Sequence, residues 1–183
     1  MSALLITTIY FLFPAYIANM LPVIANRLDV LHPLARPIDG GFKFYGEYLF
    51  GSSKTWRGLV IGVLGSMFIA IIQFFLFPLQ IVAPYSFVDF GAIDPLTFGF
   101  AGGVGALGGD LIKSFFKRRF GIKSGQPWPV FDQLDFIIGY FAATVLLIGF
   151  RSDIFIAALI VTLILHPMTN LFAYLLRIKK VWW

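Results

Sequence analysis

The hydrophobic positions of this chain fall into five long runs instead of the short amphipathic periods that are typical of a soluble domain. A bilayer core of about 30 Å needs roughly 20 apolar residues in helical conformation to cross it. Each run therefore predicts a membrane-spanning helix, and together they predict an all-α polytopic membrane protein. The predicted spans cover residues 4–24, 59–82, 96–112, 136–150 and 154–178.

The composition supports a single membrane domain over residues 1–183. Hydrophobic residues make up 59% of the chain, charged residues only 13%, and the mean hydropathy is +0.87. No repeat or low-complexity tract divides the sequence. No motif in the sequence indicates an oligomeric state. The chain has no cysteine, which excludes thiolate metal sites and cysteine nucleophiles.

The basic residues predict an orientation in the cell membrane. They concentrate between the first and second spans, between the third and fourth, and after the fifth, whereas residues 78–95 carry none. Lys and Arg mark cytoplasmic loops. We therefore expect an outside N-terminus, with both long basic loops, the C-terminus and any active site among them on the cytosolic side. The net charge of +5 is explained in this way, and nucleic-acid binding is not expected.

Two acid-bearing clusters lie at the ends of predicted spans. Asp110 is followed on the same helical face by Lys113, Ser114 and Lys117, with Arg118 next to them. Asp132 and Asp135 share a face just before the fourth span. Ionised acids near hydrocarbon are costly, which makes them candidates for function. The alternative is that these acids pair with neighbouring lysines or cap a helix and bind no ligand.

The chemistry of these acids suits a hard cation. Carboxylates without a nearby cysteine or histidine form an oxygen donor set of the kind that binds Mg²⁺ together with substrate phosphates. We expect Asp110 and Asp132 to bind the metal and Asp135 to be a weaker third ligand or to accept a hydrogen bond from a group that itself contacts the metal. The candidate catalytic residues are Asp110, Asp132, Lys113 and Lys117.

A third polar cluster precedes the second span. It offers two cations, a hydroxyl and a glycine that permits close backbone approach, although such a segment by itself is also typical of an interfacial anchor. Asn19 lies between two helix prolines and is expected either to face an interior cavity or to make an interhelical hydrogen bond. His166 is assigned to packing or to a hydrogen bond between helices. The third cluster consists of Lys54, Thr55, Arg57 and Gly58.

Taken in order, the three clusters over roughly residues 53–135 resemble the membrane cytidylyltransferases that make CDP-activated lipids. Ser124 and Gln133 replace an Asp and an Arg of the bacterial and eukaryotic phosphatidate enzymes, and the His-Gly-Gly stretch of those enzymes is absent. The five spans and residues 127–134 are most similar to the archaeal members that make CDP-archaeol.

This resemblance implies an Mg²⁺-dependent transfer of CMP from CTP to 2,3-bis-O-geranylgeranylglycerol 1-phosphate, an isoprenoid ether lipid phosphate drawn from the surrounding membrane lipids. The cations and hydroxyls are then expected to bind substrate phosphates. These candidates are Lys54, Thr55, Arg57, Gly58, Ser114, Arg118, Lys123 and Asn19, in addition to the catalytic lysines Lys113 and Lys117.

Other functions stay open at this point. Phosphatidate is an alternative substrate, and a small ion-coupled transporter would also place acids beside kinked spans, although no inverted repeat is present. A CDP-alcohol phosphotransferase is disfavoured because its Asp pattern is missing. The segment 103–108 matches the dinucleotide-binding fingerprint in form only, since a hydrophobic span surrounds it instead of a strand and a turn.

Overall fold

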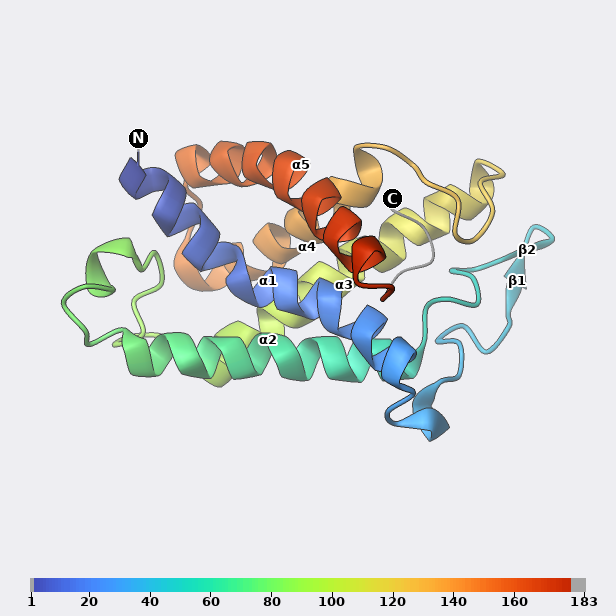
Figure 1. The fold of residues 1–183 in the computed structure, drawn as a ribbon, viewed down its shortest axis with the longest axis horizontal. Helices are drawn as coiled ribbons and strands as arrows, with labels where there is room; N and C mark the ends of the chain where they lie inside the picture. The colour runs from blue at the N-terminus through green and yellow to red at the C-terminus, as the bar shows by residue number, and fades with distance from the viewer. Residues whose placement is uncertain (1, 179–183) are drawn as a thin grey trace.

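The computed structural model describes residues 2–178, and within that range the chain forms a bundle of five α-helices that run back and forth along one axis (Figure 1). Two short 3₁₀ turns, His32–Leu34 and Ala83–Tyr85, lie in the connections. The helices are α1 (Ser2–Leu28), α2 (Trp56–Leu76), α3 (Pro95–Arg119), α4 (Phe131–Ile148) and α5 (Ser152–Leu175).

The all-α prediction holds except for one small hairpin. β1 (Lys43–Phe44) and β2 (Glu47–Tyr48) pair antiparallel within the loop between α1 and α2. Both strands are exposed on both faces. So short a ladder adds little to the stability of the fold.

Four of the helices within residues 2–178 are long and apolar enough to cross a membrane: α1, α2, α4 and α5. The sequence predicted five spans, and the fifth candidate is α3. This helix has 25 residues and the length to cross a bilayer, but its glycines and its charged C-terminal turns lower its hydropathy. Apolarity alone therefore identifies four spans.

The helix boundaries follow local capping signals. Thr55 begins α2 by accepting a hydrogen bond from the Gly58 backbone N–H, and Asp94 begins α3 by accepting one from Thr97. Pro95 occupies the first helical position, where its missing N–H costs nothing. The fourth helix begins at Phe131, five residues before the predicted hydrophobic run, so Asp132 and Asp135 lie inside it.

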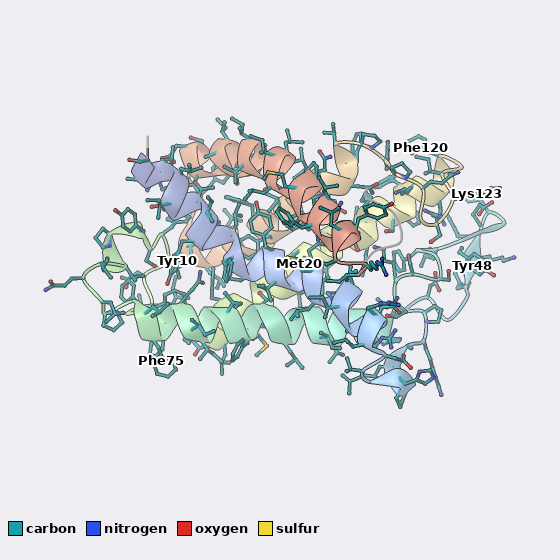
Figure 2. All side chains as sticks on the ribbon, in the orientation of Figure 1. Tyr10, Met20, Tyr48, Phe75, Phe120 and Lys123 are labelled. Carbon is teal, nitrogen blue, oxygen red and sulfur yellow. The ribbon has the colours of Figure 1, made fainter. Side chains whose placement is uncertain are left out.

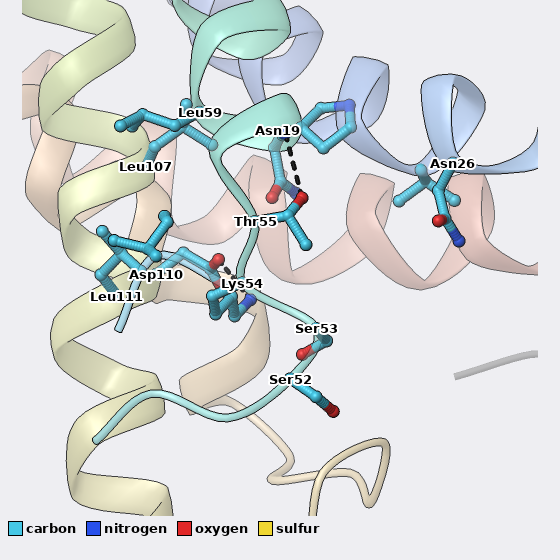
Figure 3. A pocket seen from close by; sticks show the side chains of 14 residues that line it. Asn19, Asn26, Ser52, Ser53, Lys54, Thr55, Leu59, Leu107, Asp110 and Leu111 are labelled. Atoms are coloured by element: carbon cyan, nitrogen blue, oxygen red, sulfur yellow. Dashed lines mark hydrogen bonds and ion pairs between the residues drawn. The ribbon is translucent and has the colours of Figure 1, made fainter. Parts of the chain in front are cut away.

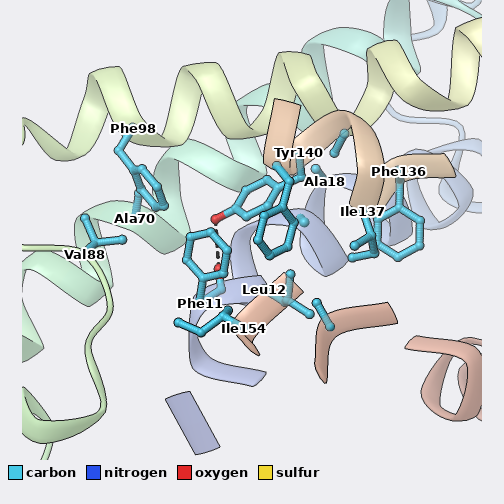
Figure 4. Close-up of a cluster of buried hydrophobic side chains, with 14 of the residues drawn as sticks. Phe11, Leu12, Ala18, Ala70, Val88, Phe98, Phe136, Ile137, Tyr140 and Ile154 are labelled. Carbon is cyan, nitrogen blue, oxygen red and sulfur yellow. Dashed lines mark hydrogen bonds between the residues drawn. The ribbon is translucent and has the colours of Figure 1, made fainter. Parts of the chain in front are cut away.

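The core lies where α1, α3 and α4 meet. Phe11, Phe98 and Tyr140 are all buried there, with ring centroids 5.1 to 6.2 Å apart (Figure 4). Aromatic pairs at such spacings add to the stabilisation that burial provides. These three rings join helices that are distant in the sequence.

Hydrogen bonds from α2 and α4 hold the first helix at Pro14. This proline lies inside a continuous helix, and because it has no N–H it leaves the Tyr10 carbonyl without its usual intrahelical donor. Gln73 of α2 donates its side-chain N–H to that carbonyl at 2.5 Å. Tyr140 of α4 donates its hydroxyl to the next carbonyl, that of Phe11, at 2.8 Å. The proline thereby becomes a point of attachment for two neighbouring helices.

The two ends of the bundle differ in character (Figure 2). One end carries the α1–α2 loop, the α3–α4 loop and the C-terminal end of α5, with Tyr48, Phe120 and Lys123 among its residues. The other end carries the start of α1 and residues 77–94. The two long basic loops therefore lie at the same end of the molecule.

We expect Gln73→Leu and Tyr140→Phe each to lower the free energy of unfolding by about 1 kcal/mol, because the first leaves the Tyr10 carbonyl without its side-chain donor and the second removes the buried hydrogen bond to the Phe11 carbonyl. Denaturant unfolding of the detergent-purified protein measures the change. Tyr45→Phe is the control because its side chain is 90% exposed. Unfolding curves of the two core variants that superimpose on that of Tyr45→Phe would contradict this account.

Candidate active site

Three carboxylates surround one lysine at the end of the bundle that carries the long loops. The Lys113 ammonium lies 3.1 Å from Asp110, 2.8 Å from Asp132 and 2.9 Å from Asp135. All four side chains are largely removed from solvent. The lysine therefore compensates charges that would otherwise be costly at this depth.

Two further lysines complete this cluster. Lys54, from the loop before α2, pairs with the second oxygen of Asp110. Lys117, one turn beyond Lys113 on α3, lies 3.0 Å from Asp132. The backbone N–H of Trp128 also donates to Asp132 at 2.6 Å, which ties the α3–α4 loop to this carboxylate. All three sequence clusters thus contribute charges to one constellation.

The close approach of α3 and α4 brings the carboxylates together. A Cβ atom added to Gly139 would stand 2.1 Å from the Gly105 carbonyl oxygen, and one added to Gly109 would stand 2.2 Å from the Asp135 carbonyl oxygen. Only glycine fits such backbone contacts. Asp110 follows Gly109 directly, so this crossing sets the separation of Asp110 and Asp135. The sequence analysis did not connect Gly139 with the site, because its only signal is a lone glycine in an apolar helix.

Two adjoining cavities flank the cluster. The first, of about 470 Å³, lies among α1, the starting turn of α2 and α3, and apolar walls from Pro22, Leu59 and Leu107 line much of it (Figure 3). The second, of about 320 Å³, lies among α1, α3, α5 and both long loops. Its walls carry Lys113, Lys117 and Arg118, which are absent from the lining of the first cavity.

The boundary between the cavities is formed by residues that line both. The Lys54–Asp110 ion pair is part of this boundary, and so is Asn19. Asn19 therefore faces cavity space, which agrees with the first of the two interpretations of its sequence context. Val23 and Ser53 complete the shared lining.

Arg118 is a buried cation with an unsatisfied donor. The residue is 8% exposed, and its Nε has no hydrogen-bond partner within residues 2–178. Its side chain is part of no hydrogen bond or ion pair among the described residues. The carboxylates of Glu47 and Asp132 attract the guanidinium without forming a direct ion pair, and an anion in the adjoining cavity would supply such a partner.

The remaining predicted residues occupy different surroundings. Ser114 is buried and lines the second cavity, whereas Lys123 is exposed and lines neither. Thr55 caps α2, and both Thr55 and Gly58 line the first cavity. Arg57 is 4% exposed and donates to Asn26 at 2.6 Å and to Asp29 at 2.8 Å, so its guanidinium joins the start of α2 to the end of α1.

The hairpin loop is held against α3 by backbone contacts. Burial raises the pKa of the Asp39 carboxyl, but hydrogen bonds from the N–H groups of Phe50, Gly41 and Gly51 outweigh burial and hold that pKa below its usual range. Arg119 donates to the carbonyls of Tyr48 and Leu49 at 3.1 Å. The loop that carries Lys54 is thereby fixed beside the cluster.

The fifth helix contributes residues that the sequence analysis did not connect with the site. Thr169 and Asn170 line the second cavity, and so does His166, which the sequence analysis assigned to packing or to a hydrogen bond between helices. His166 Nδ1 and the Asn170 side-chain nitrogen lie 3.5 Å apart. No sequence signal identified these residues, because α5 is about 20 residues beyond the last cluster and reads as an ordinary apolar span.

Within the part of the chain that the structure describes, no three His, Asp or Glu side chains are arranged as a metal-binding group. The three carboxylates converge on the Lys113 ammonium instead. Their chemistry nevertheless fits a hard cation, because the donors are oxygens only. The three carboxylates therefore stabilise a positive charge at the position that the Lys113 ammonium occupies.

Comparison with known proteins gives one consistent result. The profile of the CarS-like family, described as CDP-archaeol synthase, matches residues 1–183. The CDP-archaeol synthase of Methanocaldococcus jannaschii is 34% identical over 181 residues, covering 98% of each chain. That of Methanopyrus kandleri is 35% identical over 178 residues, covering 96% of this chain and 91% of the relative. A solved structure of an intramembrane enzyme for archaeal membrane lipid biosynthesis superimposes with a TM-score of 0.72 at 30% identity, over 88% of this chain and 91% of the other.

Gly139→Ala is expected to destabilise the protein by about 1–3 kcal/mol, since the added methyl group forces α3 and α4 apart. The thermal unfolding midpoint in detergent measures this. Gly108→Ala is a matched control on the facing helix, because its added Cβ meets nothing within 4 Å. Equal midpoints for the two variants would show that the close glycine contact does not hold these helices together.

Proposed function

The chain belongs to the CarS-like family of CDP-archaeol synthases, and on that premise we propose that it transfers CMP from CTP to 2,3-bis-O-geranylgeranylglycerol 1-phosphate. The products are CDP-archaeol and pyrophosphate. The enzyme acts in archaeal phospholipid biosynthesis as a membrane cytidylyltransferase. The departures of Ser124 and Gln133 from the phosphatidate enzymes favour the ether lipid over phosphatidate.

One observation carries this proposal: residues from all three sequence clusters line a single cavity. Lys54, Asp110 and Asp132 reach it from a loop and two helices, and three further cations lie beside them. A triphosphate is a compact polyanion, and a lipid phosphate is a second one. A partly buried group of lysines and an arginine beside carboxylates suits the joint binding of such substrates.

Catalysis of this reaction depends on the alignment of the two phosphates and on the neutralisation of their negative charge. An oxygen of the lipid phosphate attacks the α-phosphorus of CTP, and the bond from that phosphorus to the β-phosphate oxygen breaks. The lipid phosphate is already largely ionised, so no strong base and no covalent protein nucleophile are needed. The protein holds both phosphates in line and neutralises their repulsion, which accounts for most of the rate enhancement.

Individual roles follow from the surroundings of each side chain. We assign Lys54, Lys113, Lys117 and Arg118 to the substrate phosphates, with Ser114 as a hydroxyl donor in the same cavity. Thr55 and Gly58 lie at the first cavity, where the capped start of α2 holds the Lys54 loop in place. The donors of Arg57 are engaged by α1, so we assign it a positioning role.

Magnesium is the cofactor that suits the carboxylates. Asp110 and Asp132 would hold it, and Asp135, which is 9% exposed and accepts from the Phe136 N–H at 2.7 Å, is the weaker third ligand. When bound, Mg²⁺ supplies positive charge to the triphosphate and to the leaving pyrophosphate. Lys113 balances the same carboxylates in the protein as described.

We further propose that α3 crosses the membrane as a fifth span. It runs through the middle of the bundle between α2 and α4, which shield its glycine-rich face from lipid. The end with both long basic loops and the active site would then face the cytosol, in keeping with the positive-inside rule. The N-terminus would lie outside.

With CTP, Mg²⁺ and the geranylgeranyl ether phosphate, the purified protein should form CDP-archaeol detectable by mass spectrometry. Asp110→Asn should reduce the rate by at least about a hundredfold, since one carboxylate of the proposed metal site is lost. Asp89→Asn, a change in the loop at the opposite end, is the control and should leave the rate unchanged.

Phosphatidate tested in parallel decides between the lipid substrates. Product from phosphatidate alone would replace the ether lipid in this proposal. If neither lipid reacts while the protein remains folded, the assigned activity is wrong for this chain.

Orientation can be tested with single cysteines because the chain has none. In intact cells an impermeant maleimide should label Ala92→Cys, in the loop between α2 and α3, and should spare Tyr45→Cys in the hairpin. Permeabilised cells should show labelling of both. The opposite pattern would reverse the proposed topology.

A further inference from the structure

Two adjacent arginines at the end of α3 have opposite surroundings. Arg119 donates to the carbonyls of Tyr48 and Leu49 and lies over the Phe115 ring at 3.9 Å. Arg118 lines the second cavity, is 8% exposed, and its side chain makes no hydrogen bond among the described residues. Arg119 therefore holds the hairpin, whereas the guanidinium of Arg118 is left available to a ligand in the cavity.

The charged residues of α3 follow one another from the boundary between the cavities toward the long loops. Asp110 is at the boundary that both cavities share, whereas Lys117 and Arg118 line only the second cavity. With a rise of 1.5 Å per residue, Arg118 lies about 12 Å farther toward the loops than Asp110. An extended triphosphate is long enough to lie along much of this distance.

The lipid phosphate and the nucleotide must reach the cluster from different sides. The lipid phosphate is tied by its glycerol to chains in the bilayer, so it approaches from the membrane side of the cluster. Pyrophosphate is a free polyanion and must leave toward water. An in-line displacement places the attacking oxygen and the leaving oxygen on opposite sides of the α-phosphorus.

We propose that Arg118 binds the leaving pyrophosphate, so that CTP lies along α3 with its α-phosphate beside the Lys54–Asp110 pair and its β- and γ-phosphates toward Lys117 and Arg118. The lipid phosphate attacks from the first cavity, across the shared boundary. This inference rests on the proposed function and adds to it the polarity of the nucleotide and the place of the leaving group.

The step is balanced without a further reactant. A bond forms between the lipid phosphate oxygen and the α-phosphorus, and the bond from that phosphorus to the bridging oxygen breaks. The bonding electrons leave with pyrophosphate, whose new charge develops next to the Arg118 guanidinium. That guanidinium then gains a direct ion-pair partner, which the described side chains do not give it.

The reverse reaction tests the proposal directly. With CDP-archaeol and pyrophosphate as substrates, Arg118→Gln should raise the KM for pyrophosphate about tenfold or more, as expected for the loss of a charge-assisted contact. The KM for CDP-archaeol should stay near the wild-type value. Arg27→Gln removes an exposed guanidinium at the end of α1 that lines neither cavity, and it is the control, expected to leave the KM for pyrophosphate unchanged.

Direct binding separates this inference from the activity itself. Equilibrium dialysis of radiolabelled pyrophosphate with Mg²⁺ should show weaker binding to Arg118→Gln than to the wild type or Arg27→Gln, whether or not the lipid reaction is seen. Equal pyrophosphate binding by all three proteins overturns the role of Arg118. If Arg118→Gln instead raises only the KM for the lipid, the polarity is reversed and the proposal fails. A wild type that binds pyrophosphate but makes no CDP-lipid contradicts the proposed function alone.

Discussion

The backbone contact between α3 and α4 is the constraint on which the site depends. Gly105, Gly109 and Gly139 let the two helices approach so closely that each added methyl group would overlap a backbone atom of the facing helix. In a bilayer, where lipid tails compete equally for apolar side chains, such packing is a main source of helix association. Here it also has a chemical consequence, because the acids that follow Gly109 and precede Gly139 are brought to a single lysine.

That proximity creates an electrostatic problem which the structure solves locally. Three carboxylates near the hydrocarbon boundary repel one another and lose hydration, and either effect alone is costly. Lys113 lies within 3.1 Å of all three, and Lys54 and Lys117 each add a further partner. The result is a preorganised set of opposite charges, and the proposed binding of phosphates and a metal ion would exchange the internal partners of this set.

The rest of the bundle holds this set at one end. Tyr140 and Gln73 attach α1 to α4 and α2 at Pro14, while Arg57 joins the start of α2 to the end of α1. Arg119 and Asp39 hold the hairpin loop. Each contact satisfies polar groups of the chain, and each fixes an element that carries or adjoins a charged residue of the site. Stability and chemistry are therefore served by the same polar side chains in much of this bundle.

The hydrophobic runs determined by themselves that the chain is helical and spans a membrane, because a bilayer accepts backbone only when its hydrogen bonds are satisfied internally. The spacing of Asp110, Lys113 and Lys117 also determined that these groups share a helical face. Only the tertiary structure decided which partners they meet. The crossing at Gly139, the two cavities and the contrast between Arg118 and Arg119 depend on contacts between distant segments. Adjacent arginines are indistinguishable in the sequence, and they differ only because one turns toward backbone carbonyls and the other lines a cavity.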